Sequence, residues 1–92
     1  MTYFAGTYQT ERGETWSVFE TPGTLIAYNH YAEPAVILRA QQQTYGCLIL
    51  VDEKSASHAT ENDIVGLGRK FIEPLFEKVG QNICKYRFDV KD

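Results

Sequence analysis

The sequence contains no long run of apolar residues and no leader-like start. Its apolar stretches, AVIL at 35–38 and CLILV at 47–51, are far shorter than the ~20 residues that a membrane-spanning helix needs. The opening residues MTYFAGTYQ lack the basic start and long apolar core of a signal peptide. We therefore expect a cytoplasmic protein that does not enter a membrane.

Basic residues are few. Nine Lys and Arg face twelve Asp and Glu, for a net charge of −3, and the only short basic clusters are GRK at 68–70 and KYR at 85–87. Binding to duplex nucleic acid normally needs a broad basic face, because Lys and Arg must displace the counterions of the phosphates. We expect no nucleic-acid partner.

Histidine and cysteine are scarce, with two residues of each. None of the patterns H-x-H, C-x-x-C or H-E-x-x-H occurs, so we expect neither a metal site nor a cofactor. Cys47 and Cys84 each lie within an apolar pattern. In a cytoplasmic protein two such thiols should be buried and reduced rather than joined in a disulfide.

The chain has the composition of a folded soluble domain. Its 92 residues are 43% hydrophobic and 23% charged, which is close to the average for globular proteins and argues against intrinsic disorder. The length fits a single domain over residues 1–92.

The first third of the chain has strand and turn signals. TYFAGTYQT at 2–10 and TWSVFE at 15–20 are separated by ERGE, and TPG at 21–23 leads into TLIAYNHY at 24–31. Glycine supplies the positive φ that such tight turns need. These segments predict a three-stranded antiparallel meander.

Residues 34–45 are ambiguous. As a helix the segment would begin at Pro34 and end before Gly46, and as a strand it would use Val36, Ile37 and Leu38. We favour the strand, because a turn at 44–46 would then lead into GCLILV at 46–51. That short apolar run predicts a central buried strand.

A helix is predicted over 60–80. Thr60 is a natural N-cap, and Glu61 and Asp63 follow in the first turn, where negative charge meets the positive end of the helix dipole. Pro74 predicts a kink near 70–74, or two shorter helices that meet there. Gly66 and Gly68 each cost about 1 kcal/mol relative to alanine in a helix, so they indicate a close contact within the domain or across an interface.

The last segment, NICKYRFDV at 82–90, alternates between apolar and charged residues, as a strand with one buried face does. Together the segments predict an α+β domain. A mostly antiparallel sheet of about five or six strands packs on one long kinked helix, and the C-terminal strand returns to the sheet.

No catalytic constellation is evident. His58 lies in DEKSASHATEND at 52–63 with serines and acids nearby, but the Gly-x-Ser-x-Gly elbow is absent, and sequence neighbours rarely supply the geometry of a nucleophilic site. A polar loop followed by a capped helix explains these residues. GLGRK at 66–70 lacks the spacing and the Ser or Thr of a phosphate loop. We expect no catalytic residues.

Aromatic residues crowd the predicted meander: Tyr3, Phe4, Tyr8, Trp16, Phe19, Tyr28 and Tyr31. Strand side chains alternate, so these rings lie on both faces of a sheet that one helix can cover on one side only. Surplus aromatic surface is typical of interfaces. We therefore expect a non-catalytic protein-interaction or regulatory module that works as a homodimer or with a protein partner. Its expected binding or interface residues are Tyr8, Trp16, Tyr28, His30 and Tyr31.

Two alternatives stay open. One is a small-molecule binding domain whose pocket, between helix and meander, takes a small apolar ligand and is lined by Tyr28, His30, Trp16 and Phe71. The other is an enzyme that uses His58 or His30 with a carboxylate.

Overall fold

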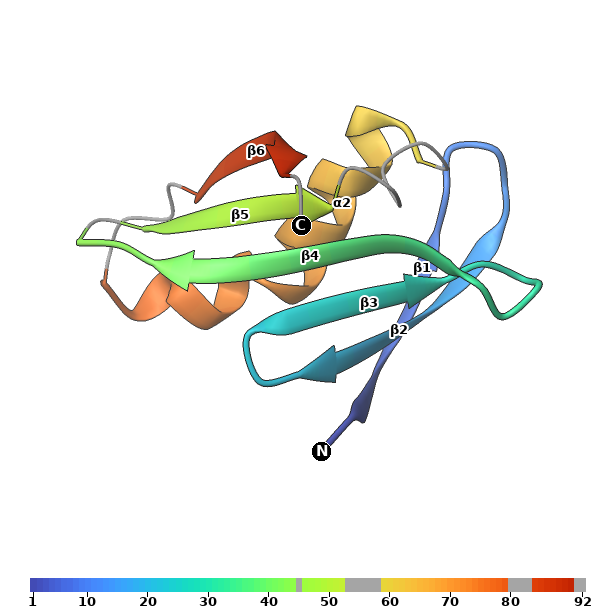
Figure 1. The fold of residues 1–92 in the computed structure, drawn as a ribbon, viewed down its shortest axis with the longest axis horizontal. Coiled ribbons are helices and arrows are strands. Elements are labelled where there is room, and N and C mark those ends of the chain that lie inside the picture. The colour runs from blue at the N-terminus through green and yellow to red at the C-terminus, as the bar shows by residue number, and fades with distance from the viewer. Residues whose placement is uncertain (45, 53–58, 80–83, 91–92) are drawn as a thin grey trace.

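In the computed structural model the chain forms one six-stranded sheet with a helix packed on one of its faces (Figure 1). The structure describes residues 1–44, 46–52, 59–79 and 84–90. The strands follow one another across the sheet in chain order. They are β1 (Tyr3–Gln9), β2 (Thr15–Thr21), β3 (Thr24–Tyr28), β4 (Pro34–Gln42), β5 (Cys47–Asp52) and β6 (Cys84–Val90).

The sheet is mostly antiparallel, as the sequence predicts. Strands β1 to β5 form an antiparallel meander, whereas β6 runs parallel to β5. The parallel pair arises because the chain crosses one face of the sheet between β5 and β6, and a crossover of that length returns the strand in the same direction. The ambiguous segment is the strand β4, so the helical alternative for 34–45 is wrong. Its Ile37 and Leu38 pair with Ile26 and Leu25 of β3.

The predicted long helix over 60–80 is only partly present. The α-helix α2 (Glu61–Phe71) has 11 residues, and the 3-10 helix η1 (Glu73–Val79) follows it. Pro74 accounts for the break, because proline has no N–H to continue the α-helical pattern and its ring crowds the preceding turn. The two shorter helices therefore replace one kinked helix. The predicted N-cap is confirmed, since the Thr60 hydroxyl oxygen accepts the N–H of Asp63 at 3.1 Å.

The core lies between the sheet and α2. It is built from the inward side chains of β2 to β5 and from the apolar stripe of the helix, as strand and helix periodicities require. Its largest fully buried members include Trp16, Leu38, Ile49, Ile64 and Leu67. No helix in the described part of the chain is long and apolar enough to cross a membrane.

The close contact predicted at the helix glycines is present within the domain. A Cβ atom at Gly66 would collide with the ring and hydroxyl of Tyr8, and one at Gly68 would collide with Tyr86. Tyr8 belongs to β1 and Tyr86 to β6, the two edges of the sheet. The glycines thus let a tyrosine from each edge strand reach the helix backbone.

The prediction of reduced cysteines is wrong, because Cys47 and Cys84 form a disulfide. The two residues face each other at the start of the parallel pair β5 and β6, with their Cα atoms 4.4 Å apart. That separation lies at the short end of the usual range for disulfides. The sequence did not reveal this pair, because the two cysteines are 37 positions apart and only the crossover makes their strands neighbours.

Candidate functional site

The two faces of the sheet differ in what covers them. Both α2 and η1 lie on one side (Figure 1), and among the described residues no other element lies over the opposite side, which we call the open face. Strand alternation places on the open face the side chains that point away from the core. Across neighbouring strands these include Phe4, Phe19, Ile26 and Ile37, which stand opposite one another in register.

The expected interface residues do not share one surface. Trp16 lies on the helix side of the sheet and is 1% exposed, so it is a core residue. Tyr8 packs beside it with ring centroids 6.3 Å apart. Tyr28 is on the open face, and His30 and Tyr31 lie in the turn between β3 and β4. Trp16, His30 and Tyr31 nevertheless line one pocket, Tyr28 lines another beside the same turn, and Tyr8 also takes part in a contact with α2.

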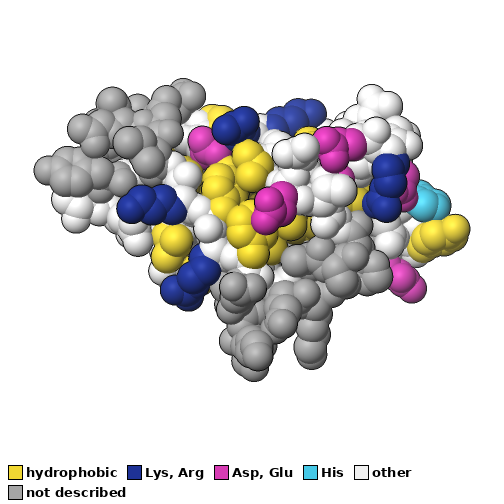
Figure 2. Space-filling model, turned by 90° about the horizontal axis from the view of Figure 1, so that it is seen from above, with side chains coloured by type: hydrophobic (Ala, Val, Ile, Leu, Met, Phe, Trp, Pro, Cys, Tyr) yellow, Lys and Arg dark blue, Asp and Glu magenta, His cyan; other side chains and the backbone are white. Residues whose placement is uncertain are grey.

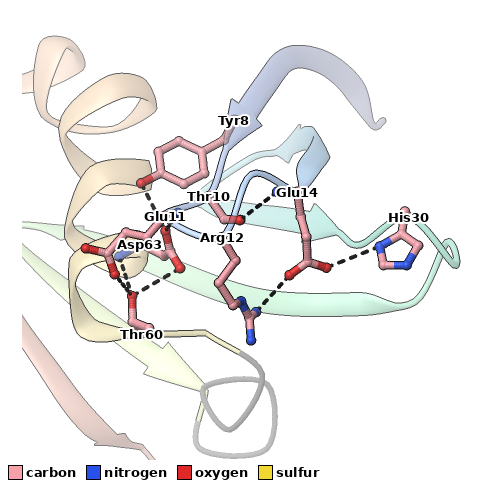
Figure 3. A network of polar contacts seen from close by, with 8 residues as sticks. All are labelled: Tyr8, Thr10, Glu11, Arg12, Glu14, His30, Thr60 and Asp63. Atoms are coloured by element: carbon pink, nitrogen blue, oxygen red, sulfur yellow. Dashed lines mark hydrogen bonds and ion pairs between the residues drawn. The ribbon is translucent and has the colours of Figure 1, made fainter.

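That contact joins the β1–β2 hairpin to the start of α2 (Figure 3). Asp63 is fully buried, and its Oδ1 accepts the hydroxyl of Tyr8 at 3.4 Å and the backbone N–H of Glu11 at 3.1 Å. The Thr60 hydroxyl lies 3.1 Å from the other Asp63 oxygen and 2.9 Å from Glu11 Oε2. Burial, followed by the charge of Asp63, raises the pKa of Tyr8 above its ordinary value. These bonds anchor the hairpin to the start of α2, with the partly buried Tyr8 at the contact.

A second polar group lies beside the β3–β4 turn (Figure 3). Glu14 lies between Arg12 and His30, with its Oε1 2.9 Å from Arg12 Nη2 and its Oε2 3.2 Å from His30 Nδ1. The second contact is an ion pair when the imidazole is protonated. His30 and Tyr31 stack at 4.0 Å between ring centroids.

Asn29 holds the turn in shape. Its Oδ1 accepts the backbone N–H groups of Tyr31 at 2.9 Å and of Glu33 at 3.1 Å. Its own backbone N–H donates to the carbonyl oxygen of Glu33 at 2.9 Å. A short polar side chain that bonds the backbone in this way is typical of an Asx turn. The turn therefore presents His30 and Tyr31 in a defined position.

A pocket of about 240 Å³ opens between the β1–β2 hairpin and this turn, and we call it the hairpin pocket. Trp16 contributes to its wall from the core. The indole Nε1 of Trp16 is buried and has no hydrogen-bond partner among the described residues. The pocket is lined by Arg12, Glu14, Trp16, Asn29, His30, Tyr31 and Ala35.

A second depression, of about 580 Å³, lies beside the same turn along the open face, and we call it the open-face groove. Phe19 and Tyr28 supply its aromatic surface, and Thr15 and Ser17 its hydroxyls. Asn29 and His30 line both the groove and the hairpin pocket. The β3–β4 turn is thus the ridge that separates two concave surfaces.

In the described part of the chain, the four side chains predicted to line one pocket between helix and meander do not share a pocket. Phe71 lines a separate space of about 170 Å³ under the helices, with Leu25 and Leu75 among its neighbours. Tyr28 and His30 line the open-face groove instead. The prediction failed because strand alternation places Tyr28 and Trp16 on opposite faces of the sheet.

Sequence reasoning missed the roles of Glu14 and Asn29. For Asn29 a usable signal was present, since asparagine between two strand-like segments often closes a turn through its own side chain. For Glu14 the partner Arg12 is only two residues away, but no local signal shows that His30 of the β3–β4 turn lies beside it.

Of the two histidines suggested for catalysis, the structure describes His30, whose Nδ1 lies 3.2 Å from Glu14 Oε2. His58 and its neighbouring serines fall within 53–58, outside the part of the chain that the structure describes. Elsewhere in residues 1–44, 46–52, 59–79 and 84–90, no group of three or more His, Cys, Asp or Glu side chains is placed to hold a metal ion.

Seen from above, hydrophobic side chains gather in a central area with acidic and basic side chains around it (Figure 2).

Comparisons of the chain with protein-family models, with curated proteins and with solved structures gave no match.

Proposed function

We propose that this protein is a non-catalytic binding module that self-associates through the open face of its sheet. The observation that carries the proposal is the aromatic row on that face. Phe4 is 61% exposed, although it lies in a strand and faces other apolar side chains. Exposed apolar surface of this kind is typical of an interaction site.

The row is continuous from the edge strand inward. Phe4 and Phe19 meet edge to face, with ring centroids 5.5 Å apart and planes inclined at 66°. Phe19 meets Tyr28 in the same manner, at 5.5 Å and 84°. Ile26 and Ile37 extend the apolar surface across β3 and β4. Rings that pack on one another are already ordered before binding, so little of their side-chain entropy is lost when a partner binds.

A second copy of the chain suits this surface. Sheets pack face to face about 10 Å apart, with side chains of both inner faces interleaved. In a two-fold dimer the same patch serves both copies, so one aromatic row would cover the other. The helix side of the sheet is already occupied by α2, which leaves the open face as the surface for this packing.

The first test is the solution mass over a range of concentrations, measured by light scattering on a sizing column. We expect a dimer that Phe4→Ser weakens by about tenfold or more, because each interface loses two buried rings. Leu75→Ser is the matched control: Leu75 is also 61% exposed, but it lies in η1 on the helix side. A wild-type monomer at every concentration, or equal weakening by both substitutions, would contradict the proposal.

A further inference from the structure

The space of about 170 Å³ that Phe71 lines is a pocket on the helix side of the sheet, and we call it the η1 pocket. The two helices line it from one side, and the β2–β3 hairpin and β4 line it from the other. Leu25 and Ile72 contribute buried apolar surface. Leu75, which also lines the pocket, is 61% exposed, so the apolar lining reaches the surface of the molecule.

The aromatic wall of this pocket is held in place by its neighbours. The Phe71 ring lies against Gly6 of β1, where an added Cβ atom would be only 3.2 Å from the ring. Lys70 Nζ lies 5.2 Å from the centroid of the same ring and donates to the carbonyl oxygen of Thr7 at 2.7 Å. Because these contacts already order the ring, little of its side-chain entropy remains to be lost when a ligand binds.

Glu20 is the acidic residue among the described residues that line the η1 pocket. Its side chain lies on the helix side of the sheet, because it stands opposite the core residue Leu25 in the register of β2 and β3. Glu20 is partly buried, and its carboxylate makes no ion pair or hydrogen bond with the described residues. A carboxylate that is partly withdrawn from water beside an apolar wall is stabilised by a cation. The unpaired carboxylate therefore indicates the charge of a ligand, independently of the shape of the pocket.

We propose that the η1 pocket binds a small organic amine, whose apolar body fills the pocket and whose ammonium group pairs with the Glu20 carboxylate. The apolar lining favours binding because it removes the body of the ligand from water, and the carboxylate selects for positive charge. The net charge of −3 on the chain favours a cation in the same direction. Lys70, the cation beside Phe71, is bonded to Thr7 and forms no ion pair with Glu20.

The volume of the pocket limits the ligand to about one ring. An apolar cavity of about 150 Å³ can hold a benzene molecule, and the η1 pocket is of similar size. Benzylamine, which is protonated at neutral pH, is therefore a suitable probe. Benzyl alcohol has the same ring without the charge and is its control.

The test is a titration at neutral pH, followed by the backbone amide signals in NMR spectra. Gly23 and Ala40 both line the pocket, and the N–H of Ala40 donates to the carbonyl oxygen of Gly23 at 3.1 Å. We expect benzylamine to shift both peaks along one saturating curve, at an ionic strength kept constant with sodium chloride. Benzyl alcohol should bind about fivefold more weakly or less, because it cannot form the ion pair.

A pair of substitutions tests the role of the carboxylate. Glu20→Gln keeps the size of the side chain and removes its charge. Glu33→Gln makes the same chemical change at an exposed position of the β3–β4 turn, away from the lining of the η1 pocket. We expect Glu20→Gln to weaken benzylamine binding by about fivefold and to change benzyl alcohol binding by less than about twofold. Glu33→Gln should change the binding of both by less than about twofold.

Three results would overturn the proposal: Gly23 and Ala40 peaks that show no saturating shift, equal affinity for benzylamine and benzyl alcohol, or unchanged benzylamine binding in a folded Glu20→Gln variant. Backbone peaks outside the pocket verify that the variant is folded. The outcome does not depend on self-association, because the pocket lies on the helix side and Phe4→Ser leaves its lining intact.

Discussion

Two tyrosine hydroxyls explain why α2 contains glycines where alanine would form a better helix. Tyr8 lies against Gly66 and Tyr86 against Gly68, and the Tyr86 hydroxyl donates a hydrogen bond to Glu73. The cost of glycine in the helix is offset by the approach of a ring from each edge strand. Local propensity and tertiary packing therefore disagree at these two positions, and packing prevails.

Gly68→Ala should lower the free energy of unfolding by about 1–3 kcal/mol, because the added methyl overpacks the contact with Tyr86. Urea denaturation measures the change. The loss should be smaller in a Tyr86→Phe background, since the hydroxyl is the nearest atom to the new Cβ. A gain of about 1 kcal/mol, as helix propensity alone predicts, would contradict the packing argument.

The same tyrosines make stability depend on alkaline pH. Burial, then the hydrogen bond to Glu73, raises the pKa of Tyr86 well above its ordinary value of 10.0, and burial raises that of Tyr8 less strongly. Above pH 10 the unfolded chain loses these protons before the folded protein does. Stability should therefore be fully present below pH 10 and fall as the pH rises beyond it.

Urea midpoints measured between pH 8 and pH 11 check this slope. Tyr86→Phe should flatten it, because phenylalanine has no proton to lose. Tyr31→Phe is the control: Tyr31 is 74% exposed and should leave the slope unchanged. Equal slopes in wild type and Tyr86→Phe would show that this hydroxyl does not control alkaline stability.

At the scale of elements, the crossover from β5 to β6 combines several constraints. Pro74 divides it into α2 and η1, and the disulfide ties the start of β6, where the crossover ends, to the start of β5. The strand β6 is the edge of the sheet and has only one neighbour. A covalent bond at its start therefore keeps it in register against β5.

Replacing both cysteines with serine should lower the free energy of unfolding by about 4 kcal/mol, from the loop-closure entropy of a crosslink that spans 37 residues. Comparing urea denaturation of the oxidised wild type with that of the double variant measures this loss. A reductant should weaken the wild type and leave the variant unchanged. Native protein in which both thiols react with a labelling reagent would contradict the crosslink.

The disulfide also bears on location. Such bonds persist mainly in oxidising compartments, whereas cytoplasmic thiols are kept reduced. The cytoplasmic location expected from the sequence stays a prediction, and the crosslink counts against it. The thiol labelling of protein isolated from its native source would decide between the two.

At the scale of the whole molecule, the two faces of the sheet have different roles. One face and α2 form the core that holds the fold, while the other carries the aromatic row that we propose as the dimer surface. The β3–β4 turn lies where the faces meet at the end of the sheet and lines both the open-face groove and the hairpin pocket. A dimer through the open face would therefore place the second copy close to the rim of the hairpin pocket. The wall that Trp16 forms inside that pocket would stay unchanged.

Much of the fold follows from the sequence alone, because it depends on neighbours along the chain. Glycine and proline chemistry located the turns, and the cap at Thr60 located the start of α2. The alternation in β6 is confirmed, since Cys84, Tyr86 and Phe88 are partly buried while Lys85 and Arg87 are exposed. Period and capping are local properties, so a single sequence contains them.

Tertiary structure alone decided the features that join distant segments. The parallel return of β6, the Cys47–Cys84 crosslink and the bridge of Glu14 to His30 all depend on which strands become neighbours. The same holds for Trp16, which the sequence placed at a surface and the fold buried. An aromatic pattern shows that a side chain lies on one of two faces, but only packing determines which face the helix covers.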